Sequence, residues 1–192
     1  MLTTLLELQR LKRLDRTGWT LRGQMPGAET VAAHSYGVVV AAMLLADEIK
    51  HRGVDVNVER VLRLAVLHDW AEARTGDLPR AVLHYYGAET RRAAEERAFG
   101  DIVVPLGKAQ AESLKRLHDE YEERATLEAR LVKAADIIDL LAQGLMFERA
   151  GARGLDEFWE NATTLDFKLE GAARVVVHEI LIGLAEERAK LK

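Results

Sequence analysis

The chain has 192 residues, 48% of them hydrophobic, and a formal net charge of -4 at pH 7. This length and composition predict a single domain over residues 1–192 with a sizeable apolar core, and the acidic balance argues against a nucleic-acid-binding surface. Cysteine is absent, which excludes disulfides, thiolate nucleophiles and cysteine zinc sites and favours a cytoplasmic location. We expect neither a signal peptide nor a run long enough to span a membrane.

The expected elements are all helices. Alanine, leucine, glutamate and arginine fill the segments, glycine falls mostly at their ends, and apolar residues recur with helical spacing. The sequence therefore predicts an all-α fold, a single helical bundle. The expected helices are 2–13, 30–51, 57–75, 87–101, 106–122, 124–150, 154–165 and 171–190.

Residues 15–29 form the one long loop without a periodic pattern, and they carry Arg16, Trp19 and Arg22. Long irregular loops in compact domains are usually functional or disordered. One interpretation is that Trp19 packs into the bundle and the arginines are solvated. We favour a functional loop, because the two arginines add local positive charge that the protein as a whole lacks.

The expected helix 30–51 has a histidine on its apolar face. His34, Val38, Ala41 and Leu45 follow one another at helical spacing, so His34 is expected to point inward. An inward histidine is more often a hydrogen-bonded core residue than a metal ligand. The choice between these two roles depends on what the other helices contribute.

The segment 57–75 carries the densest group of reactive side chains. His68 lies among apolar residues, Asp69 follows it, and Glu72 comes one turn after His68 on the same side of the expected helix. Imidazole and carboxylate groups are both good ligands of first-row divalent metals. Glu72 would stand beside a bound cation, in the position that a general base for a water requires. The alternative is that His68 is a core histidine.

The expected helix 124–150 places acidic residues in its core-facing stripe. Asp136 and Asp139 lie there among apolar side chains, and Lys133 comes one turn before Asp136. A buried carboxylate needs a partner, because burying an unpaired charge is unfavourable by several kcal/mol. A metal is one such partner and an arginine or a helix N-terminus is another. For Asp139 we favour the second explanation.

The last expected helix, 171–190, has apolar residues spread more widely than one narrow stripe, among them Val175, Ile180 and Leu184. An apolar surface of this width favours contact with a second copy of the chain. This surface by itself is a hint of a homodimer, and the expectation of one rests mainly on the family resemblance described below.

Three expected helices thus each place a potential ligand on an apolar face, in the order His34, His68-Asp69 and Asp136. This H…HD…D order resembles the HD-domain metal-dependent phosphohydrolases. More closely, the chain resembles the branch that contains bacterial 5′-deoxynucleotidases and the eukaryotic HD-domain-containing protein 2, up to about residue 165. The segments that carry the resemblance are Leu11–Trp19, Glu29–Ser35, His68–Glu72, Gly76–Pro79 and Leu131–Asp136.

The resemblance implies an HD-domain helical bundle that binds one divalent cation. Such a shell of nitrogen and oxygen donors suits Mn, Co, Zn, Fe or Ni. We see no second set of histidines for another ion, so a single metal is expected. The implied ligands are His34, His68, Asp69 and Asp136.

The same resemblance assigns roles around the metal. It implies that Glu72 handles the nucleophilic water, that Asp77 contacts the substrate sugar and assists the chemistry, and that Trp19 packs near that sugar. Related proteins have an arginine directly before the tryptophan to bind phosphate, whereas this chain has glycine there. Arg16 is the nearest candidate and Arg22 a possible substitute, and Lys133 could add positive charge near the site.

The expected activity is hydrolysis of 2′-deoxyribonucleoside 5′-monophosphates to nucleoside and phosphate, with little base selectivity. No glycine-rich phosphate loop or second basic cluster suited to a triphosphate is present. The family resemblance leaves open cyclic nucleotides, nucleoside triphosphates or guanosine alarmones as substrates. A different alternative is a non-catalytic regulatory bundle stabilised by its metal.

Overall fold

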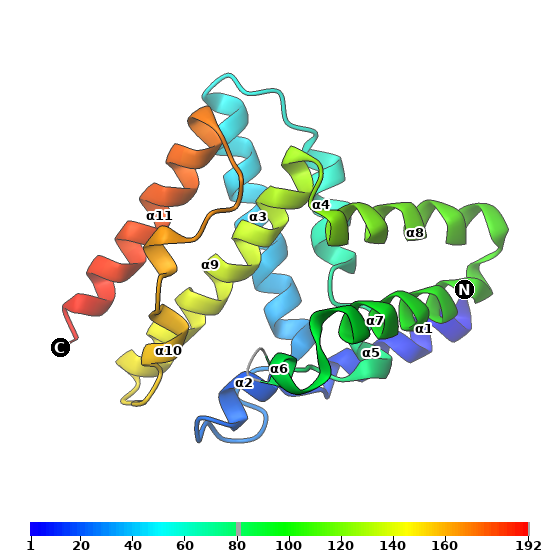
Figure 1. Cartoon of the computed structure of the whole chain (residues 1–192), viewed down its shortest axis with the longest axis horizontal. Helices are drawn as coiled ribbons and strands as arrows, with labels where there is room; N and C mark the ends of the chain where they lie inside the picture. Colours follow the sequence, from blue (N-terminus) through cyan, green and yellow to red (C-terminus); the bar gives the residue numbers. More distant parts are fainter. Residues whose placement is uncertain (80–81, 192) are drawn as a thin grey trace. The chain divides into compact units, whose positions relative to one another are not determined.

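The computed structural model describes residues 1–79 and 82–191, and they form helices joined by turns and loops (Figure 1). Within that part of the chain there is no β-strand, and one isolated bridge pairs Asp15 with Thr30. The predicted all-α fold is therefore confirmed.

The chain forms two compact units. The first consists of Met1–Ser35 and Val66–Glu123, and the second of Tyr36–Ala65 and Arg124–Lys192. Two helices, α3 (Val31–His51) and α4 (Val58–Leu67), contribute residues to both units. A single domain over the whole chain stays a prediction.

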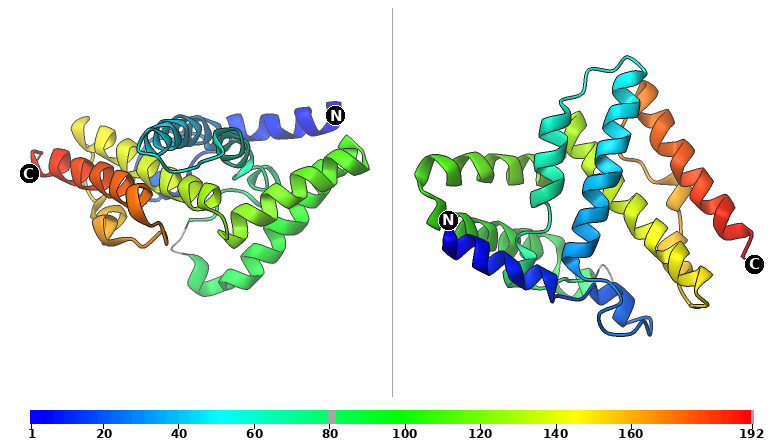
Figure 2. Two further views of the ribbon diagram at one scale, coloured as in Figure 1. Left: turned by 90° about the horizontal axis from the view of Figure 1, so that it is seen from above. Right: turned by 180° about the vertical axis from the view of Figure 1, so that it is seen from behind.

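The first unit contains a helical hairpin, α7 and α8, packed beside the shorter N-terminal elements (Figures 1 and 2). Its interior includes a stack in which Phe99 lies between Trp70 and His118, with ring centroids 6.2 Å and 4.2 Å apart. The elements wholly within this unit are α1 (Leu2–Leu8), η1 (Gln9–Lys12), α2 (Thr17–Thr20), α5 (Glu72–Thr75), α6 (Leu83–Tyr86), α7 (Ala88–Val103), η3 (Val104–Leu106) and α8 (Lys108–Glu123).

The second unit is built around two long parallel helices, α9 and α11, which lie side by side in both figures. Helix α9 begins after Thr126, whose hydroxyl accepts the Ala129 N–H and caps the first turn. The elements wholly within this unit are α9 (Leu127–Arg149), α10 (Asp156–Trp159), η4 (Ala162–Thr164) and α11 (Gly171–Ala189).

Three expected segments differ from the structure. The predicted helix 57–75 is interrupted after Leu67, where i to i+3 backbone hydrogen bonds form a tight turn before α5 begins. The predicted helix 154–165 contains only α10 and η4, because Asn161 adopts a left-handed conformation with φ of 59° between them. The loop 15–29 includes the single turn of α2.

Helix α3 also differs from expectation, since its length and apolar composition are sufficient to cross a membrane. A core helix of a globular protein meets the same criterion. Six apolar residues of α3 are buried. They are Val31, Val38, Ala42, Leu45, Ala46 and Ile49.

Candidate functional site

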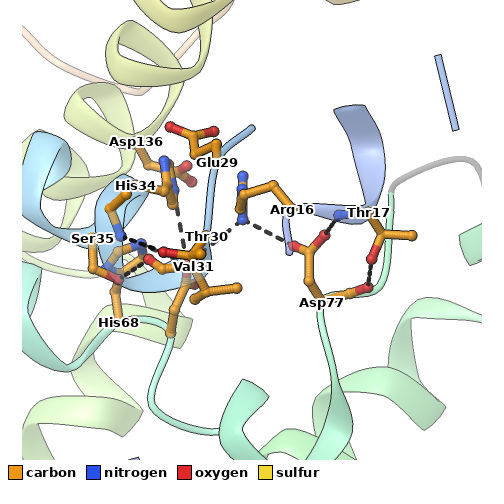
Figure 3. A network of polar contacts seen from close by, with 12 residues as sticks. Arg16, Thr17, Glu29, Thr30, Val31, His34, Ser35, His68, Asp77 and Asp136 are labelled. Atoms are coloured by element: carbon orange, nitrogen blue, oxygen red, sulfur yellow. Dashed lines mark hydrogen bonds and ion pairs between the residues drawn. The ribbon is translucent and has the colours of Figure 1, made fainter. Parts of the chain in front are cut away.

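The first turn of α3 carries His34 into the interior of the first unit. The Thr30 hydroxyl accepts the Ala33 N–H at 3.2 Å, so the helix begins with its N-terminus capped just ahead of the histidine (Figure 3). His34 is 1% exposed. The sequence predicted this inward orientation from the apolar stripe of the helix.

The interruption between α4 and α5 places His68 and Asp69 beside His34. Asp69 Oδ2 lies 3.1 Å from His68 Nε2 and 3.7 Å from His34 Nε2. The two imidazole rings are 5.6 Å apart between centroids, and the edge of Tyr121 on α8 supports the His68 ring. Two imidazole nitrogens and a carboxylate oxygen thus converge on one point, an arrangement that can hold a divalent cation.

Asp69 is ionised in this setting. Burial raises the pKa of its carboxyl, but the charge and hydrogen bond of His68, together with the charges of His34 and Arg16, outweigh that effect and hold the pKa well below its usual range. Asp69 therefore supplies a permanent negative charge between the two histidines. A negative charge in this position further favours a cation.

The pKa of Glu72 is shifted in the opposite direction from that of Asp69. Its side chain is 5% exposed, and its Oε2 atom has no hydrogen-bond partner among the described residues. Burial raises the pKa of Glu72 well above its usual value, and the negative charges of Asp69 and Asp77 raise it further. A carboxyl group with a raised pKa can accept and return a proton near neutral pH.

Asp77 forms hydrogen bonds with the residues at the start of α2 (Figure 3). Arg16 donates from Nη1 to Asp77 Oδ1 at 2.9 Å, and the Thr17 N–H donates to Asp77 Oδ2 at 2.5 Å. The Thr17 hydroxyl donates to the Asp77 carbonyl at 2.7 Å. The same Arg16 nitrogen lies 3.7 Å from Asp69 Oδ2. Asp77 therefore holds the guanidinium toward the Asp69 carboxylate.

Trp19 is enclosed by its own loop. It is 1% exposed, and its indole N–H donates to the Glu29 carboxylate. The loop ends are joined by backbone hydrogen bonds from Arg16 to Glu29 and from Val31 to Leu14, 3.0 Å and 2.8 Å long. Trp19 thus stabilises the loop that carries Arg16. Its contact with a substrate sugar stays a prediction, as does phosphate binding by the half-buried Arg22.

Asp136 and Lys133 belong to the second unit, on α9. Lys133 Nζ donates to Asp136 Oδ2 at 2.5 Å, and the two side chains are 26% and 13% exposed. The positive charge predicted for Lys133 is thus directed to the carboxylate predicted as the fourth metal ligand. That ligand role stays a prediction.

Arg91 and Glu95 on α7 were not among the residues predicted from the sequence. Arg91 Nε donates to Glu95 Oε1 at 2.6 Å, and α7 packs against α5, the helix of Glu72. The Arg91 guanidinium opposes the rise in the pKa of Glu72, so its charge acts on the site. The i, i+4 spacing of Arg91 and Glu95 was visible in the sequence, but such a pair is also typical of a solvated helix face.

Comparisons with known proteins identify the family of the chain. A sequence profile described as HD domain matches residues 8–167. The chain is 35% identical to 5′-deoxynucleotidase hdd1 of Schizosaccharomyces pombe, covering 79% of this chain and 75% of that protein. It is 34% identical to 5′-deoxynucleotidase HDDC2 of Xenopus laevis, covering 82% and 75%. The chain belongs to the HD-domain family, which confirms the resemblance inferred from its sequence.

A solved structure has the same fold over nearly the whole chain. The conserved hypothetical protein from Pyrococcus furiosus is 35% identical, and the alignment covers 97% of this chain and 99% of that one with a TM-score of 0.83. The helical architecture described above is therefore shared by a protein of nearly the same extent.

Proposed function

We propose that this protein is a metal-dependent 5′-deoxynucleotidase that converts 2′-deoxyribonucleoside 5′-monophosphates to nucleoside and phosphate. The observation that carries the proposal is that His34 and His68 both lie next to one carboxylate oxygen of Asp69. The buried acid Glu72 follows His68 by one turn. The names of the curated relatives support the substrate class.

In the proposed centre, Asp136 joins His34, His68 and Asp69 as the fourth ligand of one divalent cation, either Mn, Co, Zn, Fe or Ni. The two imidazoles and the ionised Asp69 suit such an ion. When bound, the cation supplies Lewis acidity and neutralises phosphate charge. Lys133, which contacts Asp136 in the structure, adds a second positive charge to the Asp136 carboxylate.

Glu72 is the proposed proton carrier. It accepts a proton from the water that attacks phosphorus, and it returns a proton to the 5′ oxygen as the bond between phosphorus and that oxygen breaks. The raised pKa of Glu72 suits both steps, because the group must gain and lose a proton at the same pH. Burial of Glu72 keeps bulk water away from the exchange.

Arg16 is the proposed phosphate ligand, and Asp77 positions it. The guanidinium has several donors, and its hydrogen bond to Asp77 fixes one of them while others can bind phosphate oxygens. Asp77 and Trp19 are proposed to close around the sugar. We expect little base selectivity, because the sequence contains no set of residues suited to distinguish one base from another.

Phosphate release tests the proposal. Purified protein is loaded with each candidate metal or treated with EDTA and assayed with dAMP, dCMP, dGMP and dTMP and with their ribose counterparts. We expect higher kcat/KM for the deoxy forms and no turnover with EDTA. Equal kcat/KM for the deoxy and ribo forms would contradict the proposed sugar preference. A higher kcat/KM for triphosphates, cyclic nucleotides or alarmones would contradict the proposed substrate class. No turnover of any of these would favour the regulatory bundle.

We further propose that the protein works as a cytoplasmic homodimer and that α3 is a core helix, not a membrane span. Helix α11 supports the dimer, since Val175, Ile180 and Ile182 on it are 47%, 44% and 38% exposed. Sedimentation at micromolar concentration should give twice the chain mass, and a monomer would contradict this. Partition of the protein into detergent would contradict the assignment of α3.

A further inference from the structure

Helices α3 and α9 approach each other at a glycine within the second unit. A β-carbon at Gly37 would lie 1.9 Å from Asp139 Oδ1, 2.6 Å from Cγ and 3.0 Å from Oδ2. The Asp139 carboxylate therefore occupies the space that any other residue at position 37 would fill. Asp139 is the acidic residue of the α9 stripe to which the proposed function gives no role.

The glycine is unusual in its position. Gly37 lies in the second turn of a 21-residue helix, where glycine lowers helix stability relative to alanine. It is the only glycine in α3. The close approach of Asp139 gives a physical reason for it, because a side chain at position 37 would require the Asp139 carboxylate to move.

The contact is relieved only if Asp139 moves. All three terminal atoms of Asp139 lie within 3.0 Å of the position of the missing β-carbon, so turning the carboxylate about its own bond leaves one of them in collision. A β-carbon at position 37 would force Asp139 into another rotamer or would move α9 along α3.

The two helices also carry residues of the proposed metal centre. Asp136 precedes Asp139 by three residues on α9, so the two lie on neighbouring faces of one helix turn. His34 precedes Gly37 by three residues on α3. A shift of α9 at Gly37 would thus move Asp136 relative to the helix that carries His34.

We propose that Asp139, packed against Gly37, is a positioning residue that sets the place of Asp136 along α3. This inference rests on the proposed function for the role of Asp136 as a metal ligand. It assigns to Asp139 no contact with metal or substrate. Its effect is exerted through the fit of α9 on α3.

Titration with Co²⁺ tests the inference without an activity assay, because the visible bands of Co²⁺ report both affinity and ligand geometry. Gly37→Ala should weaken Co²⁺ binding by about tenfold or more, the range seen when residues that orient metal ligands are replaced. Gly183→Ala is the matched control, since Gly183 lies on α11 with nothing within 4 Å of its β-position. It should leave Co²⁺ binding unchanged.

A double substitution identifies the cause. Asp139→Ala empties the space beside Gly37, so Gly37→Ala combined with Asp139→Ala should bind Co²⁺ no more weakly than Asp139→Ala alone. Additive losses would show that the glycine acts through something other than Asp139 and would overturn the inference. Wild-type Co²⁺ binding in Gly37→Ala would overturn it as well.

Asp139→Asn separates positioning from ligation. The amide has nearly the same shape, so Co²⁺ binding should stay near the wild-type value if Asp139 acts by packing. Loss of the ion in this variant would make Asp139 a ligand and would overturn the inference. If Co²⁺ binding follows the expected pattern while no nucleotide is hydrolysed, the proposed function fails and the positioning role stands.

Discussion

The two units of this protein bury different kinds of side chain. In the second unit, the buried residues that the structure describes are alanine, valine, leucine, isoleucine and one glycine. Its ion pairs, such as Arg188 with Glu148 and Lys133 with Asp136, join side chains that are partly exposed. Among the residues of the first unit that the structure describes, seven polar side chains are buried. They are Thr4, Glu29, His34, His68, Glu72, His118 and Glu120.

The buried polar groups of the first unit include those of the candidate site. Burying polar and charged groups is unfavourable unless each has a partner, so a unit that buries several of them has another use for them. Two carboxyl groups of this unit also have opposed pKa shifts: burial raises the pKa of Glu72, whereas the charges of His68, His34 and Arg16 lower the pKa of Asp69 against the effect of its burial. Such opposed carboxyl groups are typical of catalytic sites. The following substitutions test which buried polar groups give the first unit its chemistry.

The largest effect is expected from His68→Ala. Loss of a ligand should lower metal affinity by more than about 100-fold, since residues that only orient ligands already contribute about 10–100-fold. Metal content after purification and Co²⁺ titration measure the loss. The control is His178→Ala, because His178 is exposed on α11 in the apolar unit. Unchanged metal content in His68→Ala would contradict the proposed metal centre.

Glu72→Gln should separate chemistry from metal binding. The amide preserves shape but cannot accept a proton, so kcat should fall by about 10²–10⁴-fold while the metal stays bound. Glu96→Gln, on an exposed position of α7, serves as the control. Wild-type turnover in metal-loaded Glu72→Gln would exclude Glu72 from proton transfer.

Arg16→Gln tests the role of Arg16 as the proposed phosphate ligand. A charge-assisted hydrogen bond contributes about 1.5–3 kcal/mol, so KM for a deoxynucleoside monophosphate should rise by about 10–100-fold with a smaller change in kcat. Arg22→Gln is measured beside it. A larger rise in KM for Arg22→Gln would transfer the phosphate-binding role to Arg22.

The smallest effect is expected at His118, a buried polar residue outside the proposed chemistry. Burial lowers the pKa of His118 below its ordinary value of 6.5, although Asp119 opposes the shift. The unfolded chain therefore takes up this proton at a higher pH than the folded protein does, and the folded state loses stability as the pH falls below about 6.5.

His118→Phe keeps a ring against Phe99 and removes the proton. Between pH 7 and pH 5, its free energy of unfolding should fall by about 1 kcal/mol less than that of the wild type, measured by urea denaturation. His178→Gln should follow the wild type. Equal acid sensitivity of His118→Phe and the wild type would show that His118 does not titrate in this range.

The sequence was sufficient to predict what depends on helical periodicity. The inward faces of His34 and His68 follow from apolar residues three and four positions away, and the all-α fold follows from the same pattern. The turn after Leu67 was not predicted, because the residues on both sides have helical spacing. In the structure this turn places Asp69 beside His34, which is distant in the sequence.

Contacts between segments distant in the chain could not be predicted from the sequence either. Nothing near Asp77 in the chain indicates that it binds Thr17, and nothing near Trp19 indicates that Glu29 accepts its indole N–H. Gly37 could be noticed as a glycine inside a helix, but its partner on α9 is about one hundred positions away.

The closed ends of the loop 15–29 have a practical consequence. Because hydrogen bonds fix both ends and Trp19 fills the base of the loop, the tip is free of those contacts, and Leu21 and Met25 there are 60% and 79% exposed. Extra residues added after Met25 lengthen an exposed tip at little entropic cost. A peptide tag or fluorophore inserted at that point should leave Co²⁺ affinity unchanged, giving an attachment point for immobilised assays close to the site.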